Sequence, residues 1–242
     1  MKIPTEAEIV RYLRDNQPLL SFNNIDNEIS GHLIFKVLYI PSTRQRIQNP
    51  NADKRSKYYI EDAYEIKIEL NTAKNSTLPK VIETGNRISG VQKTYQIKTL
   101  ADLHVNPDKT VCLFTRPTEL KILEENISLF EYIDTYIIDF FYAQSYFEKY
   151  QEWPWGEFSH GTMGIFEDYL EEAGSKKTWQ IYMKALEERH DWEKYKNLAV
   201  NKKKTVRGHT KCPCQSGRKF RECHPLALDG LRKILKDKTL YQ

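Results

Sequence analysis

Three of the chain's four cysteines lie close together near its C-terminal end, and a histidine directly follows the last of them. Cys212, Cys214, Cys223 and His224 form the spacing C-x-C-x8-C-H. Structural zinc is held by four thiolate or imidazole ligands arranged as a tetrahedron. A segment of about twenty residues buries too little apolar surface to fold alone, so a bound metal would supply the missing stability. The spacing therefore predicts a structural Zn²⁺ site, with a disulfide or reduced structural cysteines as the alternatives.

The loop between these ligands contains Gly217, which can take a positive φ where the chain turns back. With its flanking cysteines the loop reads CPCQSGRKFRECH. This segment resembles the SEC-C motif, found at the tail of the SecA translocation ATPase. Gln215 departs from the motif, which commonly has a glycine there. The resemblance implies a small, non-catalytic module that contacts other proteins or ribosomes.

The first half of the chain carries the pattern of an antiparallel sheet. From Tyr64 to Leu70, apolar residues alternate with charged ones, which is typical of a strand with one buried face. Residues 32–40, 77–84 and 94–100 are interpreted as further strands, and the polar segment 41–58 as a long loop. Before the strands, Thr5 and Glu8 form a capping-box pattern that predicts the start of a helix.

Helical periodicity replaces this alternation from about Thr118. Apolar residues at steps of three and four predict one amphipathic helix, or two in line, and further helices are expected at 164–172 and 176–199. Strands followed by helices indicate an α+β architecture. We expect three parts: a main domain over 1–165, a helical extension over 166–200, and a basic linker with the zinc module over 201–242.

The charge of the chain is mild overall and concentrated locally. Lysine and arginine exceed aspartate and glutamate by a net +4, which permits weak nucleic-acid binding without indicating it. The segment NKKKTVRGHTK is strongly basic and is interpreted as a solvated linker. A contact with RNA or an acidic partner is the alternative, through Lys202, Lys203, Lys204 and Arg207. No apolar run is long enough to span a membrane and no secretory signal is recognisable, so we expect a cytoplasmic protein.

The remaining cysteine, Cys112, stands alone in the segment DLHVNPDKTVCLF. One interpretation is a small apolar residue packed in a strand between Val111 and Leu113. The surroundings suggest another. YEIKIELNTAKNSTLPKVIET, followed by LHVNPDKTVCL, resembles the core of ubiquitin-conjugating enzymes, in which strands of a meander precede a catalytic cysteine and a leucine. The resemblance implies an antiparallel meander with flanking helices, and Cys112 as a thioester nucleophile.

His104 stands eight residues before the cysteine, where that family has an asparagine. The form H-x-N-x-D-x-x-V-C-L resembles the prokaryotic branch of the family, found beside bacterial anti-phage systems such as CBASS. By this resemblance, His104 would donate an N–H to the oxyanion or take a proton from the attacking lysine. A loop-stabilising role is the alternative. Asp102 is a candidate to orient His104, whereas Asn106 and Asp108 are interpreted mainly as turn formers.

The segment WPWGEFSHG over 153–161 also resembles that branch. Glu157 and His160 are candidates to line the site or to lower the pKa of the incoming lysine. Alternatively, Trp153, Pro154 and Trp155 pack in the core at a chain reversal, or form a surface that docks a partner's tail.

The resemblances together imply a bacterial conjugating-type transferase in anti-phage defence. It would carry a protein C-terminus as a thioester on Cys112 and pass it to an amine of a target protein. The sequence has no Gly-rich phosphate loop, so a separate activating enzyme is expected. The cargo would be a ubiquitin-like protein or a cyclic-nucleotide synthase. The alternatives are a non-catalytic conjugating-like scaffold and a zinc-tailed adaptor for nucleic acid or ribosomes, and the oligomeric state is left open.

Overall fold

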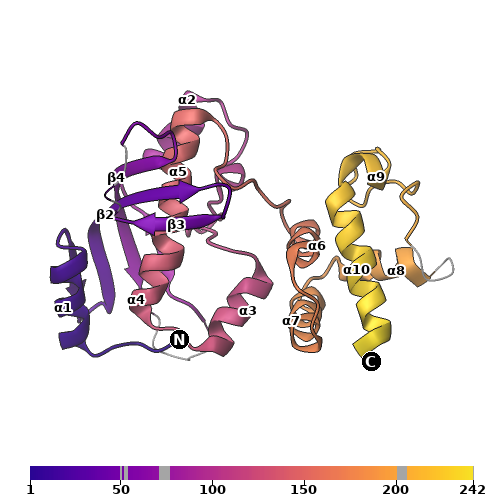
Figure 1. The fold of residues 1–242 in the computed structure, drawn as a ribbon, viewed down its shortest axis with the longest axis horizontal. Coiled ribbons are helices and arrows are strands. Elements are labelled where there is room, and N and C mark those ends of the chain that lie inside the picture. Colours follow the sequence, from indigo (N-terminus) through magenta and orange to yellow (C-terminus); the bar gives the residue numbers. More distant parts are fainter. Residues whose placement is uncertain (50, 52–53, 71–76, 201–205, 242) are drawn as a thin grey trace. The chain divides into compact units, whose positions relative to one another are not determined.

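The fold was obtained as a computed structural model, which describes residues 1–49, 51, 54–70, 77–200 and 206–241 (Figure 1). The chain divides into two units. The first comprises residues 1–113 and 122–156, and the second comprises residues 114–121 and 157–242. The domain boundaries expected at 165 and 200 stay predictions.

A five-stranded antiparallel sheet forms the centre of the first unit (Figure 1). Its strands are β1 (Leu20–Asn23), β2 (Glu28–Ile40), β3 (Gln45–Gln48), β4 (Tyr59–Glu69) and β5 (Lys80–Glu83). The order is β1-β2-β4-β5, with β3 paired to β2. Because β4 pairs with residues 28–38 of β2, β1 and β3 share the opposite edge of β2. The prediction of a loop over 41–58 is therefore wrong at β3, which pairs with residues 37–40 of β2.

The period-two prediction for β4 is confirmed. Tyr64, Ile66, Ile68 and Leu70 are all buried, whereas Glu65 between them is exposed. The helix α5 (Ile138–Tyr150) lies behind the sheet in Figure 1, and its Phe141 packs on Tyr64 with ring centroids 4.7 Å apart. The hydroxyl of Ser145 on α5 donates to the carboxylate of Asp62 at 2.7 Å. The buried face of the sheet thus has one long helix as its partner.

The other helices of this unit are α1 (Glu6–Asn16), α2 (Arg87–Thr94), the 3₁₀ turn η1 (Leu100–Leu103), α4 (Leu129–Glu131) and the π-helical η2 (Tyr132–Ile137). The capping box at Thr5 and Glu8 is confirmed. The strand expected over 94–100 is wrong, because α2 ends at Thr94 and Gln96 has a φ of 53°, which interrupts extended backbone.

The chain from 118 onward is helical, as predicted, but not continuous. Helix α3 (Arg116–Glu125) ends before Asn126, whose φ is 52°, and Ser128 caps the next helix by accepting from the backbone N–H of Glu131. A left-handed residue ends one helix and an N-cap residue begins the next, so the region holds separate helices.

The second unit is built from helices: α6 (Thr162–Glu171), α7 (Lys176–Glu187), α8 (Trp192–Val200), α9 (Phe220–Cys223) and α10 (Pro225–Tyr241). A Cβ on Gly230 of α10 would lie 1.8 Å from the carbonyl oxygen of Phe166, so the two helices approach closely at this glycine. The single helix expected over 176–199 is wrong, since α7 and α8 are separate. Between them, Asp191 accepts from the hydroxyl of Thr162 at the start of α6.

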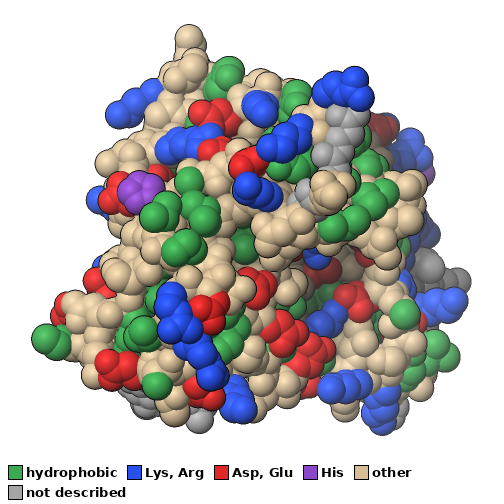
Figure 2. Space-filling view, turned by 60° about the vertical axis from the view of Figure 1, so that its left-hand side comes forward, with side chains coloured by type: hydrophobic (Ala, Val, Ile, Leu, Met, Phe, Trp, Pro, Cys, Tyr) green, Lys and Arg blue, Asp and Glu red, His purple; other side chains and the backbone are tan. Residues whose placement is uncertain are grey.

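The surface shows mixed charge. On the face drawn in Figure 2, basic and acidic side chains are interspersed, and hydrophobic side chains form small groups among them. In the described part of the chain, no helix is both long enough and apolar enough to cross a bilayer.

Candidate functional site

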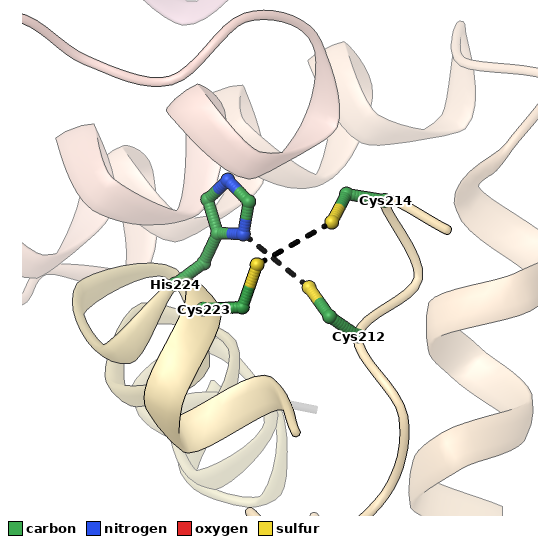
Figure 3. A group of neighbouring side chains, drawn as sticks. All are labelled: Cys212, Cys214, Cys223 and His224. Carbon is green, nitrogen blue, oxygen red and sulfur yellow. Dashed lines mark hydrogen bonds between the residues drawn. The ribbon is translucent and has the colours of Figure 1, made fainter. Parts of the chain in front are cut away.

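The four residues predicted to bind zinc converge in the second unit (Figure 3). One ligand atom from each of Cys212, Cys214, Cys223 and His224 lies within 4.8 Å of all the others. The Sγ of Cys212 is 3.3 Å from the Nδ1 of His224, and the two remaining sulfurs are 3.5 Å apart. Zinc–ligand bonds at tetrahedral angles give sulfur–nitrogen and sulfur–sulfur separations of about 3.6 and about 3.8 Å. The arrangement could therefore bind a metal ion.

The local chain explains how these ligands meet. Cys212 and Cys214 precede a tight turn that closes when the backbone N–H of Cys212 donates to the carbonyl of Arg218 at 2.8 Å. Gln215 and Gly217 in this turn have φ values of 66° and 75°. The positive φ of Gly217 is confirmed, and that of Gln215 gives the physical reason why a glycine suits its position. Helix α9 then begins at Phe220 and places the last two ligands at its end.

The cluster is attached to a hydrophobic core. Cys212 and Phe220, which are 4% and 0% exposed, belong to the same core as Trp179 and Tyr182 of α7. Burial raises the pKa of Cys212, whereas a hydrogen bond with Ser216 lowers the pKa of Cys214. Ser216 also lies 3.1 Å from the sulfur of Cys223, so it supports the cluster from outside the ligand set. The spacing of the cysteines gives no signal for this contact of Ser216.

The structure contradicts the alternative of a disulfide among the clustered cysteines. None of the four cysteines, all of which lie in described segments, is joined in a disulfide. The sulfurs of Cys214 and Cys223 are well beyond the bonded distance of about 2.05 Å. The convergence of a histidine with the three thiols favours metal ligation over a structural role for reduced thiols.

Cys112 lies at the end of a small hairpin in the first unit. Val105 and Val111 pair across this hairpin, and the N–H of Val111 donates to the carbonyl of Val81 in β5 at 2.8 Å. The hairpin therefore docks on the β5 side of the sheet. Cys112 is the next residue, and its side chain is exposed. Its backbone N–H donates to the carbonyl of His104 at 2.7 Å, which holds these two residues side by side.

His104 is fixed by its backbone and by its ring. It adopts a left-handed conformation with φ 57°, and its N–H donates to the carbonyl of Ala101. The preceding carbonyl, of Leu103, accepts from the side-chain amide of Gln144 on α5 at 2.8 Å. The imidazole meets the indole of Trp153 edge to face, with centroids 4.9 Å apart and an interplanar angle of 65°.

Asp102 and Asn106 make local structural contacts. The carboxylate of Asp102 accepts from both the N–H and the hydroxyl of Thr99, completing a capping box at the start of η1. The amide of Asn106 donates to the hydroxyl of Thr110, and Asp108 accepts from the same hydroxyl. Both contacts stabilise the hairpin turn. A role for Asp102 in orienting His104 stays a prediction.

Glu157 and His160 belong to the second unit, where an oxygen of the former lies 4.0 Å from Nε2 of the latter. Their predicted place beside Cys112 stays a prediction. Lys202, Lys203 and Lys204 lie outside the described residues. Arg207 is exposed and lines a cleft of about 540 Å³ together with Arg221 and Arg232.

Comparison with known proteins locates one motif. The SEC-C motif model matches residues 210–224, which include all four ligands of the cluster. No curated protein and no solved structure matched the chain. The match covers the metal cluster and its turn, and lies within the second unit.

Proposed function

We propose that the chain is a ubiquitin-conjugating-like transferase that carries an acyl group on Cys112 and holds a structural zinc ion in its C-terminal cluster. The observation that carries the proposal is that Cys112 is exposed and is joined through its backbone to His104 at the β5 side of the sheet. Thioester transfer needs an accessible thiol, and a neighbouring hydrogen-bond donor or base assists it. The antiparallel sheet with a helix behind it is consistent with the conjugating-like fold.

The reaction consists of two acyl transfers. In the first, the thiolate of Cys112 attacks the activated C-terminal carbonyl of the cargo, a carbon–sulfur bond forms, and the activating enzyme's leaving group departs. In the second, a neutral amine of the target attacks the thioester, the carbon–sulfur bond breaks, and the sulfur leaves as thiolate. The amine loses one proton as the amide forms.

Both steps pass through an oxyanion that needs hydrogen-bond donors. The backbone N–H of Cys112 already donates to the carbonyl of His104, so it is occupied in this structure. The donor in our proposal is therefore a side chain, and the neighbouring imidazole of His104 is the group we assign. The alternative role of the ring is to accept the proton from the attacking amine.

Zinc in the cluster would be structural. Four protein ligands complete a tetrahedron and leave no position for water or substrate, in contrast to catalytic zinc sites with three protein ligands. The ion would stabilise the turn of the cluster against the core that contains Phe220.

The test is covalent capture in the native host. Cys112→Lys replaces the labile thioester with a stable isopeptide, and Cys112→Ser replaces it with a base-labile oxyester. We expect mass spectrometry to find the C-terminal carboxyl of another protein joined to the side chain at position 112 in both variants. Hydroxide should release only the Cys112→Ser adduct. Cys112→Ala is the matched control and should carry none.

The outcome that contradicts the proposal is equally specific. If neither variant carries a C-terminal adduct although both are expressed and folded, Cys112 is not an acyl carrier. The first unit would then be a non-catalytic scaffold.

A further inference from the structure

We propose that Trp153 is the positioning residue for His104. The chain reversal after α5 places its indole against the imidazole of His104. The role in transfer rests on the proposed function of Cys112. The placement of the His104 ring is independent of that function, because it follows from contacts within the first unit alone.

The reversal after Tyr150, the last residue of α5, is built by one left-handed residue and two contacts with Phe147. Gln151 takes a left-handed conformation with φ 57°, and its N–H donates to the carbonyl of Phe147 at 2.8 Å. This turn directs the chain back along the helix. Trp153 then stacks on the ring of Phe147, with centroids 4.6 Å apart and an interplanar angle of 28°. One face of the indole is thereby supported by the helix.

Trp153 reaches His104 from this support. Their rings meet at a centroid distance of 4.9 Å in an edge-to-face arrangement, which is a preferred geometry for aromatic pairs. The terminal torsion of histidine is broad, so the backbone of His104 alone does not fix the direction of its ring nitrogens. The indole of Trp153 on one side of the His104 ring restricts rotation about this torsion.

Helix α5 supports His104 in two ways, once directly and once through Trp153. Gln144 on α5 donates to the carbonyl of Leu103, directly before His104, and Phe147 supports Trp153. The first contact fixes the backbone, and the second fixes the ring. A hydrogen bond from the His104 ring in the transition state depends on the direction of the ring, so such support would favour transfer.

The chain offers a matched control in the same tripeptide. Trp155 stacks on Tyr142 at 5.6 Å and meets Tyr39 edge to face at 5.4 Å. It is 41% exposed. The two tryptophans thus pack on different rings: Trp153 on His104 and Phe147, and Trp155 on Tyr142 and Tyr39. Removing either one deletes the same indole from the same segment.

The experiment uses full-length, metal-loaded protein and two readouts. The first is the carbon–proton NMR signal of the His104 imidazole, which senses the ring current of a neighbouring indole. The second is the discharge of an S-acetyl group from Cys112 to free lysine. The acetyl group is loaded from 4-nitrophenyl acetate: the thiolate attacks the ester carbonyl and nitrophenolate leaves. The Cys112 peptide is then quantified by mass spectrometry.

We expect Trp153→Ala to shift the His104 signal and to slow discharge by roughly tenfold, less than the loss of about 10²-fold for removing a general base. Trp153→Phe keeps an aromatic wall and should restore most of both readouts. Trp155→Ala should change neither. Should Trp153→Ala fail to fold, Trp153→Leu, which keeps apolar bulk without an aromatic ring, takes its place in both readouts against the Trp155→Ala control.

Two results overturn the proposal. If the His104 signal is the same in Trp153→Ala and wild type, the indole does not position the ring. If the signal shifts but the discharge rate does not change, the contact is structural only. Failure of the Cys112→Lys capture experiment would instead remove the proposed function and leave the NMR result standing.

Discussion

The thiols of this chain occur in two environments that are built in different ways. In the C-terminal cluster, three thiols and an imidazole converge through a short turn, and their spacing along the chain predicts the arrangement. Cys112 is exposed at the end of a hairpin, and its surroundings come from β5, α5 and the segment after α5. Local spacing therefore suffices to recognise a metal site, whereas a candidate nucleophile acquires its neighbours only through the fold.

The sharpest contrast between the two environments is their dependence on metal. Chelation should unfold the cluster, because structural zinc contributes on the order of 10 kcal/mol to small modules. Chelation should also lower the thermal unfolding midpoint, since Cys212 and Phe220 share one core with α7. Elemental analysis and thermal melts before and after chelation measure this. Cys112→Ser should retain the full metal content, whereas Cys223→Ser should lose it. Metal-free purified protein with an unchanged melt contradicts the zinc assignment.

The link between cluster and core is tested at Phe220, which is fully buried. Phe220→Ala should lower the free energy of unfolding by about 3–5 kcal/mol and weaken metal retention, because it leaves a cavity behind the ligands. Denaturant melts of metal-loaded protein give the value. Leu226, at 59% exposed, is the control, and Leu226→Ala should stay within about 0.5 kcal/mol of wild type. If Phe220→Ala and Leu226→Ala changed the free energy of unfolding and the metal retention equally, the cluster would not depend on packing against this core.

The role of His104 separates into donor and base. Asparagine tolerates the left-handed conformation at this position and can donate an N–H, but it cannot accept the amine's proton. We expect discharge from Cys112 to fall by about tenfold in His104→Asn, and by on the order of 10²-fold or more in His104→Leu. Single-turnover discharge to lysine measures both. Wild-type rates in both variants would assign His104 to loop structure.

The smallest expected effect concerns Gln215, whose φ is 66°. A left-handed residue with a side chain costs about 1–2 kcal/mol, and the greater freedom of unfolded glycine offsets part of the gain. Gln215→Gly should therefore stabilise the metal-loaded protein by at most about 1 kcal/mol, with Gln215→Asn between the two. Denaturant midpoints report the difference. A loss of stability in Gln215→Gly would mean that the side chain contributes more than its backbone strain costs.

Features that depend on neighbouring residues were predictable from the sequence. The capping box at Thr5, the buried face of β4 and the metal ligands all follow from short spacings. Features that depend on distant pairing were not. Strand β3 is a strand because residues 37–40 of β2 pair with it, although all its side chains are exposed. The segment 94–100 alternates as a strand would, yet no described strand includes it, and the hydroxyl of Tyr95 instead donates to the carbonyl of Glu148.

The same division applies to the candidate site. The turn residues Asn106 and Asp108 could be named from their local pattern. The contact between His104 and Trp153 could not, because it requires the reversal at Gln151 and the support of Phe147. Sequence patterns identify residues capable of chemistry, and the tertiary fold decides which of them meet.

Native-state alkylation tests most directly whether the chain holds two kinds of thiol. Metal-loaded protein is treated with iodoacetamide, digested and analysed by mass spectrometry, before and after chelation. We predict rapid labelling of Cys112 in the folded protein, with labelling of the three cluster cysteines only once the metal is removed. Protection of Cys112 until the protein is denatured would contradict its place as an accessible acyl carrier.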